Sequence, residues 1–96
     1  MCTLITRTVT ISGQAKSGPE WMPLSTAHVY YDHPMAMTSE HAVILDLVDE
    51  VDGKRRGRIG IELSARSAAE LVRALQSVLD EDEAKDELAA TASRPA

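Results

Sequence analysis

The sequence predicts an α+β domain, in which a four-stranded antiparallel sheet has one C-terminal helix packed on one face. Three observations predict this fold. Four segments have the alternation or the β-branched composition of strands, at residues 3–12, 27–33, 41–48 and 58–63. The dipeptide Asp52-Gly53 is typical of a hairpin turn. After the last strand the apolar residues change to helical spacing, so a helix follows the sheet and covers it.

The first strand is followed by a segment rich in strand-breaking residues. Residues 3–12 alternate between polar and aliphatic side chains, and Arg7 interrupts the aliphatic side, which indicates an edge strand. We expect residues 13–26 to form a loop. Within this loop, Trp21 and Met22 are expected to tuck under the sheet as core residues. The strand-breaking residues are Gly13, Gly18, Pro19 and Pro23.

The sequence patterns of the three later strands predict different positions in the sheet. The second strand, 27–33, ends at Pro34, which has no N–H for a sheet hydrogen bond. The third, 41–48, is apolar on both faces, as in a central strand. The fourth, 58–63, alternates cleanly. The basic run at 54–56 is expected at a hairpin tip, where a solvated loop is favoured over an anion site.

The helix has a clear apolar stripe and an unfavourable end. Ser67 opens a capping box, and Ser64 is an alternative N-cap. The acidic residues after Leu79 oppose the negative helix C-terminus, so we expect the helix to end there. This gives a single domain at 1–79 and an acidic, flexible tail containing Ala, Ser and Pro at 80–96. The stripe consists of Ala68, Leu71, Val72, Leu75, Val78 and Leu79.

One helix covers only one face of a sheet, and the other face also carries apolar residues. We therefore expect a homodimer, the commonest symmetric solution, with a cleft between sheets for a small-molecule ligand. Residues 80–87 alone sum to −5, the net charge of the whole chain, and a chain without a wider basic surface is a poor nucleic-acid binder. The single cysteine and the absence of a long apolar run favour a cytoplasmic protein without membrane association.

The residues that carry chemistry cluster where the second strand ends and the third begins. His33 ends one strand and His41 opens the next, so antiparallel pairing brings the two imidazoles side by side. Asp32 and Glu40 lie next to them and are candidates to orient an imidazole as a general base. Tyr31, or its neighbour Tyr30, is a candidate proton donor. Alternatively, Asp32 and His33 cap the strand end and His41 bonds locally.

A metal site uses some of the same residues. Cys2, His33 and His41 supply thiolate and imidazole ligands that suit zinc or another transition metal, although the alternative is a metal-free protein without cofactor. Cys2 as an ordinary thiol is the competing interpretation. His28 shares a strand face with Tyr30 and Asp32, so we expect it to face away from His33.

Several motifs resemble a family of small bacterial proteins, mainly actinobacterial, of unknown function. They are Met-Cys-Thr at 1–3, Val-Thr-Ile-Ser-Gly at 9–13, Trp-x-Pro-Leu at 21–24, Val-Tyr-Tyr-Asp-His-Pro at 29–34 and Glu-His at 40–41. The resemblance covers residues 1 to about 79 and leaves the acidic tail outside. It implies that Cys2, Asp32, His33, Glu40 and His41 belong to a shared pattern, and it implies no mechanism.

Three functions fit these observations. The first is a small cofactor-free isomerase, cyclase or hydrolase acting through the His/Asp/Glu residues at the sheet end. The chain is short for a nucleotide-cofactor fold, and it contains no Gly-rich phosphate loop and no Gly-x-Ser-x-Gly elbow. The second is metal binding without turnover. The third is a non-catalytic dimeric accessory protein whose histidines are structural.

Overall fold

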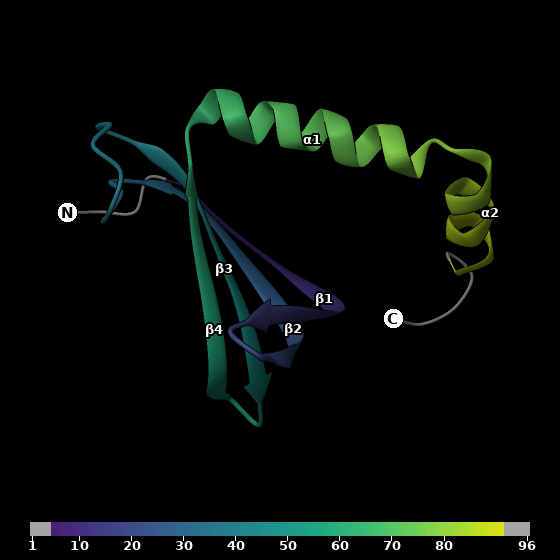
Figure 1. Ribbon diagram of the computed structural model, residues 1–96, viewed down its shortest axis with the longest axis horizontal. Helices are drawn as coiled ribbons and strands as arrows, with labels where there is room; N and C mark the ends of the chain where they lie inside the picture. The colour runs from purple at the N-terminus through teal and green to yellow at the C-terminus, as the bar shows by residue number, and fades with distance from the viewer. Residues whose placement is uncertain (1–4, 92–96) are drawn as a thin grey trace. The chain divides into compact units, whose positions relative to one another are not determined.

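The computed structural model describes residues 5–91 and confirms an α+β chain with a four-stranded antiparallel sheet. The strands lie in the order β1-β2-β3-β4, and two helices follow them (Figure 1). The chain forms two compact units, one through Ala65 and one from Arg66 onward. The elements are β1 (Ile5–Ser17), β2 (Glu20–Asp32), β3 (Ala42–Val51), β4 (Lys54–Leu63), α1 (Ala65–Leu79) and α2 (Asp82–Thr91).

The predicted loop at 13–26 is wrong, because these residues extend β1 and β2 into one long hairpin. Gly18 has a φ of 78° and supplies the left-handed conformation that the two-residue turn with Pro19 needs. Pro23 pairs with Gln14 of β1, whereas the pairing of β2 with β3 begins only at Thr26. The other edge of β2 is therefore open at Pro23, where a missing N–H costs no sheet hydrogen bond.

Trp21 and Met22, near the end of this hairpin, differ in burial. The expectation that Trp21 fills the core is wrong, since its side chain is 63% exposed and its ring lies 5.9 Å from Lys16 Nζ. Met22 is half-buried, and its thioether lies over the backbone of Gly57 in β4. The hairpin thus bends across the sheet, with a register shift between Thr10 and Gly13 in β1 marking the irregularity.

The inner position of β3 is confirmed, since it pairs with β2 on one side and β4 on the other. The predicted hairpin turn is also confirmed, because Asp52 and Gly53 both have positive φ angles, of 52° and 76°. The basic run at 54–56 opens β4 instead of forming a loop, although its side chains are exposed as expected. Arg56 lies 3.2 Å from the buried carboxylate of Asp49.

The two faces of the sheet have different chemistry. The register places His28 beside Asp46 and Tyr30 beside Ile44, which in turn pair with Gly60 and Glu62 of β4. We call this side, with Asp32 and Arg58, the polar face. The opposite apolar face carries Val29, Leu45, Leu47 and Ile59. Among the described residues the buried hydrophobic side chains are Ala27, Ala42 and Val48, so the core is thin.

Helix α1 begins at Ala65, directly after the alternative N-cap Ser64, so the capping box predicted at Ser67 is wrong. α1 ends at Leu79, but residues 82–91 form a second helix where only a flexible tail was expected. Asp82 and Glu83 in the first turn of α2 interact favourably with its positive N-terminal end, which explains why the acidic run starts a helix there. The apolar stripe of α1 is exposed, and its packing on the sheet stays a prediction. Neither helix of the described part is long and apolar enough to cross a membrane.

Candidate functional site

The predicted meeting of His33 and His41 is confirmed. Their ring centroids lie 4.8 Å apart, and the ring of Tyr31 stacks on His41 at 5.4 Å. Both histidines are half-buried, at the place where β2 ends and β3 is about to begin. The sheet register explains the proximity, because Asp32 pairs with Ala42 and the flanking residues therefore leave the sheet together.

The two carboxylates beside these histidines have different surroundings. Asp32 Oδ1 accepts a hydrogen bond of 2.7 Å from the backbone N–H of His33, which is the strand-capping contact of the alternative interpretation. Glu40 is exposed in the connection between β2 and β3. Ser39 donates to the backbone carbonyl of His41 at 3.1 Å, so this histidine is also held locally through its main chain. A role for either carboxylate in orienting an imidazole stays a prediction.

His28 lies on the polar face, where its ring is stacked on that of Tyr30 with the centroids 6.3 Å apart. The hydroxyl of Thr8 lies 3.0 Å from His28 Nδ1, and Glu50 Oε1 lies 3.3 Å from its Nε2. The contacts link β1, β2 and β3 through a single side chain. Both ring nitrogens are thus engaged, and a histidine held in this way acts as a cross-strand polar link.

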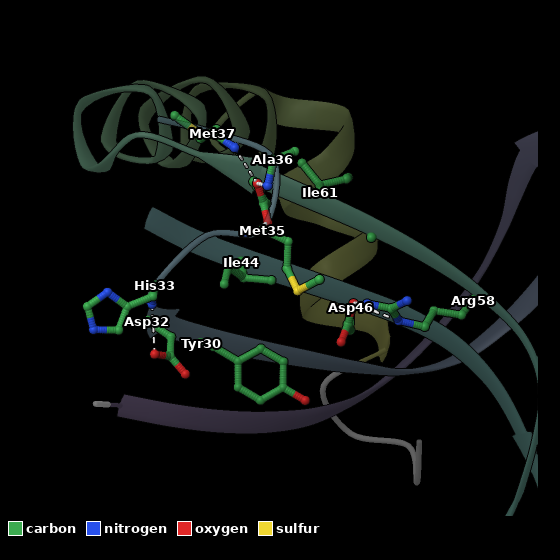
Figure 2. A pocket seen from close by; sticks show the side chains of 12 residues that line it. Tyr30, Asp32, His33, Met35, Ala36, Met37, Ile44, Asp46, Arg58 and Ile61 are labelled. Atoms are coloured by element: carbon green, nitrogen blue, oxygen red, sulfur yellow. Dashed lines mark hydrogen bonds and ion pairs between the residues drawn. The ribbon is translucent and has the colours of Figure 1, made fainter. Parts of the chain in front are cut away.

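A cavity of about 840 Å³ opens on the polar face at the end that carries the connection between β2 and β3. Figure 2 shows Tyr30, Ile44 and Asp46 bordering it, with the Met35 side chain extended toward Asp46. His33 lines one end, but Figure 2 shows its ring turned away from Tyr30 and Asp46. His41 is not among the lining residues. The lining is completed by Asp32, Ala36, Met37, Arg58, Gly60, Ile61 and Glu62.

Glu62 holds the loop that borders this cavity. Its Oε2 accepts a hydrogen bond of 2.6 Å from the backbone N–H of Met35. Its Oε1 accepts two more, of 2.9 Å from Ala36 and 3.0 Å from Met37. The N–H groups of Met35, Met37 and Ala36 stabilise the ionised form and hold the pKa of the Glu62 carboxyl below its ordinary value. One carboxylate therefore fixes three successive peptide groups.

An ion pair forms the charged part of the lining. Asp46 is buried in β3, and its Oδ1 accepts from Arg58 Nη2 at 2.8 Å and Nε at 3.0 Å. The Arg58 side chain is 55% exposed, so the guanidinium shields the carboxylate from one side and meets solvent on the other. A Cβ added at Gly60 would lie 3.4 Å from both groups, so the backbone passes close beneath the pair.

Three residues of this site were missed by the sequence analysis: Asp46, Arg58 and Glu62. A signal for Asp46 was available, because a carboxylate in an otherwise apolar central strand requires a partner. No comparable signal existed for Glu62, since its loop partners lie more than twenty residues away in the chain. For the metal hypothesis, Cys2 lies outside the described residues. Within them, no group of three His, Cys, Asp or Glu side chains is arranged to hold a metal ion.

Comparison with known proteins places the chain in one family. The chain belongs to the family of unknown function DUF6295, whose model matches residues 1–90. The resemblance to a family without an assigned activity is therefore confirmed, and it reaches beyond residue 79 into α2. The bacterial origin and the individual motifs stay predictions. No curated protein and no solved structure matches the chain.

Proposed function

We propose that this member of DUF6295 binds a small molecule with an apolar body and one polar end in the cavity on its polar face. The observation that carries the proposal is the cavity itself, with the loop at its border tied down by Glu62. Its volume of about 840 Å³ falls within the range of small-molecule sites in proteins. A fixed border favours binding, because less conformational entropy is lost when the ligand enters.

The lining divides into two parts that suit the two ends of such a ligand. Ile44 and the methionines of the loop offer apolar and polarizable contacts. The phenol of Tyr30 and the Asp46–Arg58 pair offer hydrogen-bond donors and acceptors. We infer that the apolar body lies against Ile44 and the loop, and that the polar end meets Tyr30 or Arg58.

Filling the cavity tests this function. Ile44→Trp is expected to weaken the binding of small apolar fragments by at least about tenfold, because the indole occupies their space. The measurement is the change in amide chemical shifts of Tyr30, Ile44 and Gly60 during titration with a fragment library. Val43→Trp is the matched control, since Val43 precedes Ile44 and faces the other side of the sheet. If no fragment shifts the cavity amides of the wild-type protein, the proposal is wrong.

A proton-transfer reaction is the second candidate function. His33 lines the cavity and its ring lies against His41, so an imidazole is available at one end of the site. For that role the ring has to rotate toward the ligand, and Tyr30 supplies the phenol of the lining. Isomerisation, cyclisation or hydrolysis of a small cytoplasmic molecule would use this imidazole as general base.

The histidine pair has a test of its own that separates packing from metal binding. We expect His33→Ala and His41→Ala each to lower the melting temperature by about 4 °C, because a ring–ring contact contributes on the order of 1 kcal/mol. The losses should be equal with and without a chelator. If a chelator lowers the melting temperature of the wild-type protein but of neither variant, and purified protein contains stoichiometric zinc, the zinc site is supported instead.

A further inference from the structure

The sheet has two edges of very different composition. β4 forms one edge and carries four exposed basic residues, Lys54, Arg55, Arg56 and Arg58. Long charged side chains on an edge strand prevent another strand from pairing with it. β1 forms the other edge, and in its stretch Ile5–Ile11 the only charged residue is Arg7. The first half of β4 and the first half of β1 thus differ strongly in charge.

The edge formed by β1 has the properties of a pairing surface. It is thirteen residues long, and all of its residues except Ile11 and Ala15 are exposed. Its β-branched residues favour an extended conformation. One local contact partly covers it, since Arg7 Nη1 donates to the backbone carbonyl of Thr6 at 2.9 Å. Because the Arg7 side chain is exposed, a sheet hydrogen bond replaces this contact at little cost.

We propose that β1 pairs with β1 of a second copy of this chain in antiparallel orientation, which joins two sheets into one of eight strands. The pairing is isologous, so each copy uses the same strand, and it covers the edge of β1. The thin core supports the need for a partner, since few hydrophobic residues of the sheet are fully buried.

Self-pairing about Thr8 gives a register with favourable side-chain contacts. Thr8 then faces Thr8 of the second copy, and Thr6 faces Thr10, so hydroxyl-bearing side chains form a ladder across the join. Arg7 faces Val9 of the second copy, which keeps the two guanidinium groups apart. The half-exposed side chains of Ile5 and Val9 become partly covered.

Opposite charges at one position test this register. Val9→Lys places an ammonium opposite Arg7 twice in the dimer, and we expect it to raise the dimer dissociation constant about tenfold. Val9→Glu creates two opposite-charge pairs and is expected to lower that constant by about as much. Sedimentation equilibrium measures both. The variants share the same exposed site, and equal melting temperatures of the dilute monomers show that folding is unaffected.

A cross-link provides the second measurement. In a Cys2→Ser background, Thr8→Cys is expected to form an intermolecular disulfide, because facing Cα atoms lie about 5 Å apart. Thr10→Cys is the control, since the register separates its two copies by about 14 Å along the strands. Three results overturn the proposal: a wild-type monomer up to about 1 mM, a dimer that ignores the charge at position 9, or equal cross-linking of both cysteines. A dimer formed through the sheet face or α1 would give the second result.

Discussion

Replacing Arg58 by Met is expected to lower the free energy of unfolding by about 2 kcal/mol, the largest loss that we expect from a single exposed side chain. The reason lies in its partner, since Asp46 is buried and takes two hydrogen bonds from the guanidinium. A buried carboxylate without a cation remains poorly solvated. Loss of a partner from a fully buried pair costs more, but Arg58 is half-exposed and solvent screens part of the effect.

Urea unfolding of single and double variants measures this contribution. Asp46→Asn combined with Arg58→Met should recover most of the lost stability, because the amide that remains carries no charge. Arg55→Met is the control, since it removes an exposed guanidinium from the same strand. Equal losses in Arg55→Met and Arg58→Met would show that the ion pair has no special role. The same pair lines the cavity, so ligand binding is expected to weaken in Arg58→Met as well.

Replacing Glu62 by Gln is expected to release the loop at 35–37 and to weaken fragment binding with it. The carboxylate accepts hydrogen bonds from Met35, Ala36 and Met37, whereas a carboxamide has one acceptor oxygen and a donor group that faces the same N–H groups. We expect hydrogen exchange of these three amides to accelerate on the order of tenfold. Glu40→Gln is the control, since Glu40 is an exposed carboxylate in the same connection.

The loop should also respond to pH, and the direction follows from the lowered pKa of Glu62. Its folded-state pKa lies below the ordinary value of 4.5, so its contribution to stability is fully present above pH 4.5. The contribution is lost as the pH falls through the lowered folded-state pKa and the carboxylate takes up a proton. The ratio of loop exchange rates in Glu62→Gln and wild type should therefore approach one in acid. A ratio that stays constant from neutral pH downward contradicts the role of the ionised carboxylate.

Local patterns were sufficient for most of the sheet. The alternation in β4, the apolar β3 and the Asp52-Gly53 turn were each predicted and then confirmed, because short-range conformational preferences decide them. The loop prediction at 13–26 failed for the opposite reason. Glycine and proline usually interrupt strands, but in this hairpin Gly18 makes the turn and Pro23 meets an edge that needs no N–H.

In the candidate site, too, some features follow from local sequence patterns and others only from the tertiary structure. The neighbourhood of His33 and His41 could be predicted because both residues flank one connection between antiparallel strands. The cavity could not, since it depends on Asp46 and Arg58 pairing across two strands and on Glu62 reaching a loop distant in sequence. Such contacts follow from strand register and sheet twist, which single-residue patterns do not encode.

The sequence by itself thus determined the strand-rich α+β class, the inner position of β3 and the meeting of two histidines. These features depend on side-chain alternation and on residues close together in the chain. Only the tertiary structure decided that the polar face, rather than the histidine pair alone, carries the cavity. The physical reason is that the buried carboxylate of Asp46 and the backbone N–H groups of the loop each need a polar partner. β4 provides these partners, with Arg58 bound to Asp46 and Glu62 bound to the loop.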